Sequence, residues 1–260
     1  MQNSMLILRK EWLEIRQQRG LLLSIIIPFL VLALLPIVLL YVTSLGIHVN
    51  LSNMNIGKTV AIAGLSSHEM LQVLAGKEFS TFYVLLPSII PCIIASYSIV
   101  GEKTSRTLEP LLATPVHIWE LLVGKCLAAL LPSVVLTWFC GICFIGAAAL
   151  FSLSSDVFAA IISPAWLIIF LLWTPLLALI AVATMVAISS RVNDPRTAQQ
   201  ISAWVVIPFL VLFYGQLLGF VFLGITLALS VFLVLLILTV LTIWLATRIF
   251  QREVILTRWK

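Results

Sequence analysis

The stretch that decides the fold is residues 21–43, "LLLSIIIPFLVLALLPIVLLYVT", in which no side chain carries a charge. A helix of about 20 apolar residues crosses a hydrocarbon core about 30 Å thick, so this run is long enough for one crossing. Similar apolar runs follow along the rest of the chain. We therefore predict an all-α integral membrane protein with six transmembrane helices, over residues 21–43, 79–100, 126–151, 165–190, 203–218 and 220–247.

The composition agrees with this interpretation. Of the 260 residues, 62% are hydrophobic and only 10% are charged, and the mean hydropathy is +1.19. These values lie outside the range of globular proteins. Residues 21–43 are also longer than the apolar core of a signal peptide, and no small-residue cleavage site follows them, so we expect them to remain in the mature chain as part of one transmembrane domain over residues 1–260.

The positions of the cationic residues predict the orientation, because Lys and Arg are retained on the cytoplasmic side of a membrane. With the N-terminus inside and six crossings, thirteen of the fifteen Lys and Arg residues fall in cytoplasmic segments, and only Lys58 and Lys77 fall outside. We therefore expect a multi-pass protein of the cell membrane with both termini in the cytoplasm. The same pattern explains the net charge of +5 by topology and lipid contact, with no role for nucleic acid.

None of the charged side chains is predicted to lie inside the six spans, and the three histidines are assigned to loops. Ion-coupled carriers usually keep an ionisable residue near the middle of the membrane, and an intramembrane enzyme needs a polar catalytic group there. This absence disfavours both classes. An ion-coupled carrier or channel without an ATPase partner remains the alternative to an ATP-driven transporter.

A nucleotide-binding loop of the form G-x-x-x-x-G-K-[ST] is also absent from the sequence. The nearest candidates, around Lys58 and Lys125, both lack the first glycine. We therefore expect a non-catalytic subunit without a cofactor, and any ATP and Mg would be bound by a partner. A metal site is not expected either, because His68 beside Glu69 supplies too few ligands.

The segment "GEKTSRTLEPLLATPVHIWE", residues 101–120, is predicted to lie in the cytoplasm between spans two and three. N-cap signals and a leucine stripe predict a short helix there, and Thr114-Pro115 predicts a second helix that continues through Glu120 into span three. The apolar face of the short helix needs a surface to cover it. Either the bilayer interface or a groove on a soluble partner would serve, and the mixed charges at its rim favour the partner.

The string Gly101 to Glu109, "GEKTSRTLE", followed by Leu111-Leu112, Thr114-Pro115 and Gly124-Lys125, resembles the cytoplasmic loop of the type-two permease family of ATP-binding cassette exporters. The resemblance implies a permease with six spans that exports its substrate, paired with a second permease chain and with ATP-binding cassette ATPase subunits. It also implies that residues 101–120 form the coupling helix that docks on the ATPase. The residues expected to make this contact are Glu102, Arg106, Thr107, Leu108, Glu109, Leu111, Leu112 and Pro115.

Residues 5–19 have the pattern of an amphipathic helix lying on the membrane surface, with Met5, Leu8, Trp12 and Ile15 on one stripe. The family resemblance implies an interfacial elbow helix that touches the ATPase near the coupling helix. The alternative, a simple membrane anchor, stays open. On the other side of the membrane, residues 44–78 are predicted to form an extracellular loop with some helical character.

The remaining predictions concern the interior of the spans. Cys140 and Cys143, on either side of Gly141, are interpreted as small residues at a packing seam and not as a redox pair. A route for substrate is expected between two copies of the chain or a copy and a sister chain, and walls without fixed charge would suit a lipid-like, amphipathic or drug-like cargo. The sparse polar and aromatic residues proposed to line it are Tyr41, Tyr83, Ser96, Tyr97, Ser98, Trp173, Thr174, Tyr214 and Gln216.

Overall fold

The structure is a computed structural model that describes residues 2–45, 66–100, 118–189 and 224–249, together with isolated residues between 192 and 214. The described part is helical. Its elements are α1 (Gln2–Gln17), α2 (Arg19–Ser44), α3 (Ser67–Ser80), η3 (Thr81–Val84), α4 (Leu86–Ala95), η4 (Ser96–Val100), α7 (Ile118–Phe151), α8 (Ser155–Ile161), α9 (Pro164–Ile168), η5 (Ile169–Trp173), α10 (Thr174–Ser189) and α13 (Ile225–Ile249).

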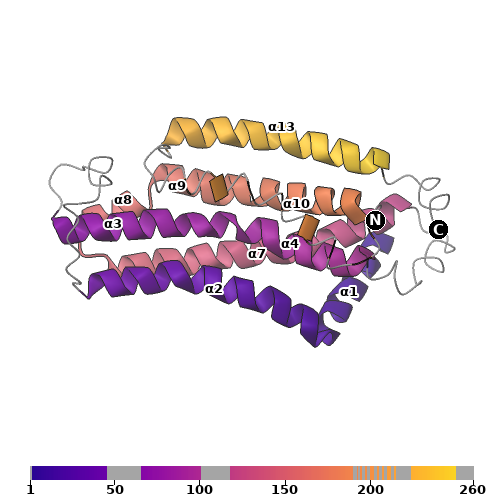
Figure 1. Cartoon of the computed structure of the whole chain (residues 1–260), viewed down its shortest axis with the longest axis horizontal. Coiled ribbons are helices and arrows are strands. Elements are labelled where there is room, and N and C mark those ends of the chain that lie inside the picture. Colours follow the sequence, from indigo (N-terminus) through magenta and orange to yellow (C-terminus); the bar gives the residue numbers. More distant parts are fainter. Residues whose placement is uncertain are drawn as a thin grey trace.

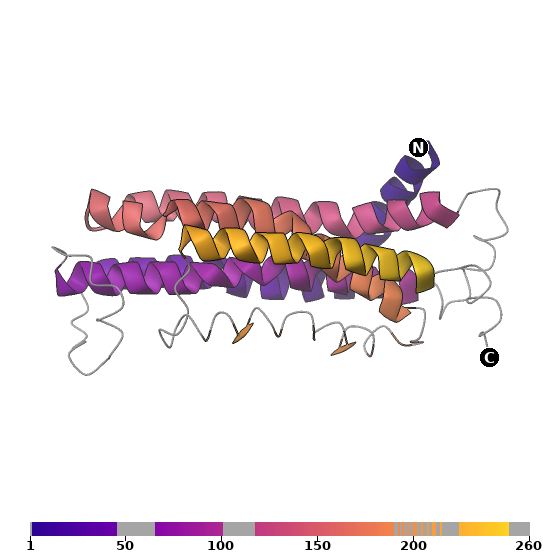
Figure 2. The ribbon, with the colours of Figure 1, turned by 90° about the horizontal axis from the view of Figure 1, so that it is seen from above.

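These elements form an elongated helical bundle (Figure 1). Five helical stretches in the described part are long and apolar enough to cross a membrane, namely Arg19–Ser44, His68–Ser98, Val123–Phe151, Ser155–Ile188 and Ile225–Thr247. The short helix α1 leaves the bundle at an angle (Figure 2), and the carboxyl end of α13 lies at the same end of the bundle as α1. We call this end the α1 end.

Burial differs between the central and the outer helices. Nearly every residue of α4 is buried, and α4 packs against α7, α10 and α2. In contrast, α2 and α13 expose rows of large aliphatic side chains on their outer faces, such as Ile27 and Ile237. Exposed hydrocarbon over the length of a crossing is expected where a helix faces lipid, because lipid tails are as apolar as the side chains.

The second span begins earlier than predicted. The helix starts at Ser67, where the Ser66 side chain and Glu69 form a capping box, and continues through η3 and α4. The prediction of a loop over residues 44–78 is therefore wrong for residues 67–78, although the helical character noted there is confirmed. The prediction that the spans contain no charged residue and that every histidine lies in a loop is also wrong, since His68, Lys77 and Glu78 lie in α3.

Two features of the third and fourth spans connect the sequence to the packing. A helix that includes Glu120 does run into span three as predicted, because α7 extends from Ile118 to Phe151, while Thr114 and Pro115 lie outside the described residues.

Gly141 of α7 lies directly against the ring of Phe170 in the π-helical turn η5. This confirms close packing at Gly141, because any side chain there would collide with that ring, and Cys140 beside it is buried, but the prediction of a packing seam is wrong for Cys143, which is exposed.

Candidate functional site

The helix α1 is held to the bundle through one face, centred on a carboxylate. Glu11 is buried, with only 2% of its surface exposed, and its helical neighbours Ile7, Leu8 and Ile15 are half-buried. These residues are three or four positions from Glu11, so they share its face. This face packs mainly against α7 and to a lesser extent against α2.

The partner of Glu11 is Lys125 in α7. Nζ of Lys125 lies 2.7 Å from Oε1 of Glu11, and each side chain is only 3% exposed. The same Nζ donates to the backbone oxygen of Ser98 at 3.2 Å and to its Oγ at 3.0 Å. An ammonium group has three N–H donors, so Lys125 can serve these three acceptors at the same time. We call Glu11, Ser98 and Lys125 the polar junction.

The polar junction joins three segments that are far apart in the sequence. Glu11 comes from α1, Ser98 from the π-helical turn η4 that ends the second span, and Lys125 from the beginning of the third span. Losing one partner of a buried ion pair costs about 3–5 kcal/mol, because the other charge is left without compensation. The three segments are therefore strongly favoured to keep this arrangement while the pair stays buried.

The polar junction lies at the base of the segment that resembles a coupling helix. Ser98 precedes residue 101, and Lys125 follows residue 120. The eight residues predicted to contact an ATPase, which are Glu102, Arg106, Thr107, Leu108, Glu109, Leu111, Leu112 and Pro115, lie outside the described residues. The described residues on either side of this segment, Ser98 and Lys125, are in contact with each other.

The predicted elbow residues are divided between two faces of α1. Leu8 and Ile15 are half-buried on the face that meets the bundle, whereas Trp12 is 45% exposed. Trp12 belongs to an outer face in which apolar and basic side chains alternate. The exposed residues of this face are Met5, Leu6, Arg9, Trp12, Leu13 and Arg16.

The predicted pathway residues do not come together in one place. Trp173 and Thr174 are buried, and Nε1 of Trp173 donates to the backbone oxygen of Ala228 in α13 at 3.1 Å. Tyr41 and Tyr214 are exposed. Tyr97 is half-buried, and Gln216 lies outside the described residues.

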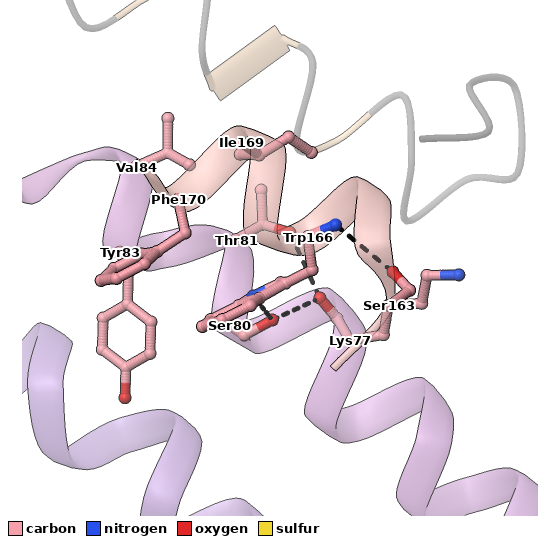
Figure 3. Close-up of a pocket in the computed structure, with 9 residues that line it drawn as sticks. All are labelled: Lys77, Ser80, Thr81, Tyr83, Val84, Ser163, Trp166, Ile169 and Phe170. Atoms are coloured by element: carbon pink, nitrogen blue, oxygen red, sulfur yellow. Dashed lines mark hydrogen bonds between the residues drawn. The ribbon is translucent and has the colours of Figure 1, made fainter. Parts of the chain in front are cut away.

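Two cavities show what the interior can hold. A polar pocket of about 20 Å³ lies between α3, η3, α9 and η5, where Nε1 of Trp166 donates to Oγ of Ser80 (Figure 3). Its volume suits about one water molecule. At the α1 end, α7, α10 and α13 enclose an apolar crevice of about 280 Å³, with Leu130, Val182 and Ala246 among its lining residues. Of the predicted pathway residues, Tyr83 lines the small pocket and none lines the apolar crevice.

The sequence analysis missed Glu11 and Lys125 as a site, although a signal was present. Glu11 lies three residues after Leu8 and four before Ile15, so a helical projection places this carboxylate at the edge of the apolar stripe, between Ile15 and Ile7. A carboxylate in that position needs a buried partner. Among the described residues no group of three or more His, Cys, Asp or Glu side chains could hold a metal ion.

A comparison with protein families gives a match over most of the chain. The family model described as ABC-2 family transporter protein matches residues 5–226, a range that includes α1, the polar junction and residues 101–120. No curated protein matches the chain.

Proposed function

The chain belongs to the ABC-2 transporter family, and from this premise we propose that it is the membrane-spanning permease subunit of an ATP-binding cassette exporter. The family match over residues 5–226 is the observation that carries the proposal. Members of this family are membrane transport components that act with ATP-binding cassette partners. ATP and Mg would then be bound by the separate ATPase subunit.

The proposed topology has six crossings with both termini in the cytoplasm. In support, α10 ends at the α1 end of the bundle and α13 begins at the opposite end (Figure 1), so one further crossing between them, at the predicted residues 203–218, would complete the path. The cationic residues Arg9, Lys10, Arg16 and Arg19 gather at the α1 end. This supports a cytoplasmic α1 end in the cell membrane.

Residues 101–120 are proposed as the coupling helix that docks on the ATPase, and α1 as the interfacial elbow. The proposal is supported by their positions, because Lys125 contacts both Glu11 of α1 and Ser98, which precedes the segment. The outer face of α1 combines Trp12 and Leu13 with Arg9 and Arg16, a pattern that suits the surface of an anionic leaflet. Two permease chains, identical or related, are expected in the complete transporter.

The proposed cargo is a lipid-like, amphipathic or drug-like molecule. The apolar crevice between α7, α10 and α13 supports this, because its lining has no charged residue. The buried ion pair of Glu11 and Lys125 gives little support to an ion-coupled carrier, since it lies at the α1 end and not midway along the spans.

The test is co-purification of the chain with an ATP-binding cassette ATPase, followed by transport measurements in liposomes. Leu108→Asp places a charge on the proposed docking face, and Leu51→Asp is the matched control in the predicted extracellular segment. We expect the wild type and Leu51→Asp to retain the ATPase and to transport, and Leu108→Asp to lose both. Failure of the wild type to retain an ATPase, or normal transport by Leu108→Asp, would contradict the proposal.

A further inference from the structure

We propose that the polar junction is the positioning element that fixes α1 to both ends of residues 101–120, so that movement of this segment is transmitted to α1. This inference rests on the proposed function, because it assigns to Glu11, Ser98 and Lys125 the link between ATPase docking and the membrane helices. In this role they are positioning residues, since no contact between them and cargo or nucleotide is implied.

The first argument is the geometry of Lys125. Its ammonium group contacts Glu11 at 2.7 Å and the two oxygens of Ser98 at 3.0 and 3.2 Å. Hydrogen bonds of this kind weaken steeply beyond about 3.2 Å, so a shift of about 1 Å between the segments breaks them. The side chain of Lys125 is therefore bonded to α1 and to η4 at the same time.

The second argument is burial. Lys125 and Glu11 are 4% and 2% exposed, so water cannot replace a lost partner while the junction stays closed. An exposed pair on the same helix, Lys10 and Glu14 at 3.3 Å, is 45% and 43% exposed and can exchange its contact for water. The buried pair therefore adds an ion pair that opposes separation of α1 from α7, whereas the exposed pair lies within α1 alone.

The third argument is the local structure around Ser98. The residues from Ser96 to Val100 form a π-helical turn, a conformation that is rare and is found mainly at functional sites. In the same turn, the hydroxyl of Ser96 donates to the backbone oxygen of Ile93 at 2.8 Å and is buried within its own helix. Of these two serines, Ser98 is the one whose hydroxyl accepts from Lys125.

The experiment uses the complete transporter with its ATPase subunit in liposomes, with three single variants, Glu11→Gln, Lys125→Met and Ser98→Ala. The matched controls are Glu14→Gln, Lys10→Met and Ser96→Ala. The measured quantities are the rate of ATP hydrolysis and the amount of cargo moved per ATP. Coupling free energies between sites commonly correspond to factors of about 5–150, so we expect Glu11→Gln and Lys125→Met to lower transport per ATP by about tenfold.

We expect hydrolysis to continue in these variants, Ser98→Ala to show a smaller loss, and the controls to match the wild type. The exchange variant Glu11→Lys with Lys125→Glu restores opposite charges and is expected to recover part of the transport per ATP. A fluorophore on a cysteine at Leu13, an exposed position of α1, gives an independent readout. Its ATP-dependent signal should be present in the wild type and in Glu14→Gln, and lost in Glu11→Gln.

The possible failures are distinct. A wild-type complex without ATP-driven transport would overturn the proposed function and this inference with it. Normal transport per ATP in Glu11→Gln and Lys125→Met, with a wild type that transports, would overturn the inference alone. If Glu11→Gln or Lys125→Met fails to assemble, Ser98→Ala and the exchange variant decide the result. Unchanged transport per ATP in Ser98→Ala, together with no recovery in the exchange variant, would also refute the inference.

Discussion

The contact between Gly141 and Phe170 leads to a prediction about stability. A Cβ atom placed on Gly141 would lie 2.0 Å from Cζ, 2.5 Å from Cε1 and 2.6 Å from Cε2 of the Phe170 ring. Carbon atoms pack at about 3.5–4.0 Å, so the ring would have to move by about 1.5 Å. We therefore expect Gly141→Ala to destabilise the protein.

The ring has little freedom to make this movement. Phe170 is stacked on Trp166 with the ring centroids 5.0 Å apart and the planes at 5°. Trp166 is in turn next to Phe144 at 5.8 Å and bonded through Nε1 to Ser80. A displaced Phe170 therefore disturbs a connected group of buried side chains. Overpacking of this kind costs about 1–3 kcal/mol.

Gly146 provides the matched control, because it lies on the same helix and a Cβ there would meet no atom within 4 Å. Both substitutions gain the same helix propensity of about 1 kcal/mol, so the difference between the two variants isolates the steric cost. For a chain of this size, about 1–3 kcal/mol corresponds to a midpoint of thermal unfolding roughly 3–10 °C lower for Gly141→Ala than for Gly146→Ala.

The assay is the loss of the monodisperse gel-filtration peak after heating in detergent. The double variant Gly141→Ala with Phe170→Leu should lose less stability than the sum of the losses in the two single variants. We expect a coupling energy of about 0.5–3 kcal/mol between the two positions. Equal midpoints for Gly141→Ala and Gly146→Ala, or strictly additive losses in the double variant, would refute the reasoning.

Three further predictions follow from buried contacts and exposure. The side chain of Gln72 donates to the backbone oxygen of Phe151 at 2.7 Å and accepts from the backbone nitrogen of Leu153 at 3.0 Å. Gln72→Ala should therefore lower the free energy of unfolding by about 2 kcal/mol in the same assay, and an unchanged midpoint would contradict this. Tyr83→Phe removes a hydroxyl that donates to a backbone oxygen of α2 at 3.0 Å, with an expected loss of about 1 kcal/mol that a stability equal to wild type would rule out. Cys143 is exposed and Cys140 is buried, so N-ethylmaleimide in detergent should modify Cys143 before Cys140, as followed by peptide mass spectrometry. The reverse order would show that α7 is rotated.

The long apolar helices could be predicted because their signal is local. An uninterrupted apolar run is enough to place α2, and α13 from Ile225 onwards falls inside the predicted last span. The start of α3 was placed too late because its first two turns are polar. The pattern Ser66-Ser67-His68-Glu69 nevertheless contains the S-x-x-E signal of a capping box, which the structure confirms.

The polar junction could not be predicted in the same way, because it depends on contacts between distant segments. Lys125 and Glu11 are separated by 114 positions, and neither belongs to a motif that specifies the other. The positive-inside rule assigns Lys125 to a cytoplasmic segment but does not identify a partner for it. Only the packing of α1 against α7 brings the two charges together and excludes water from them.

The two faces of α1 place opposite demands on its orientation. The inner face carries Glu11, which is bonded to Lys125, and the outer face carries Trp12 and Leu13, which would lie against a membrane surface under the proposed function. A rotation of α1 about its own axis would break the ion pair on one side and expose apolar surface to water on the other. Sliding past α7 would break the ion pair as well. The movement that keeps both contacts is one in which α1 and the start of α7 shift together, and in the proposed mechanism residues 101–120 would act on the spans through this motion.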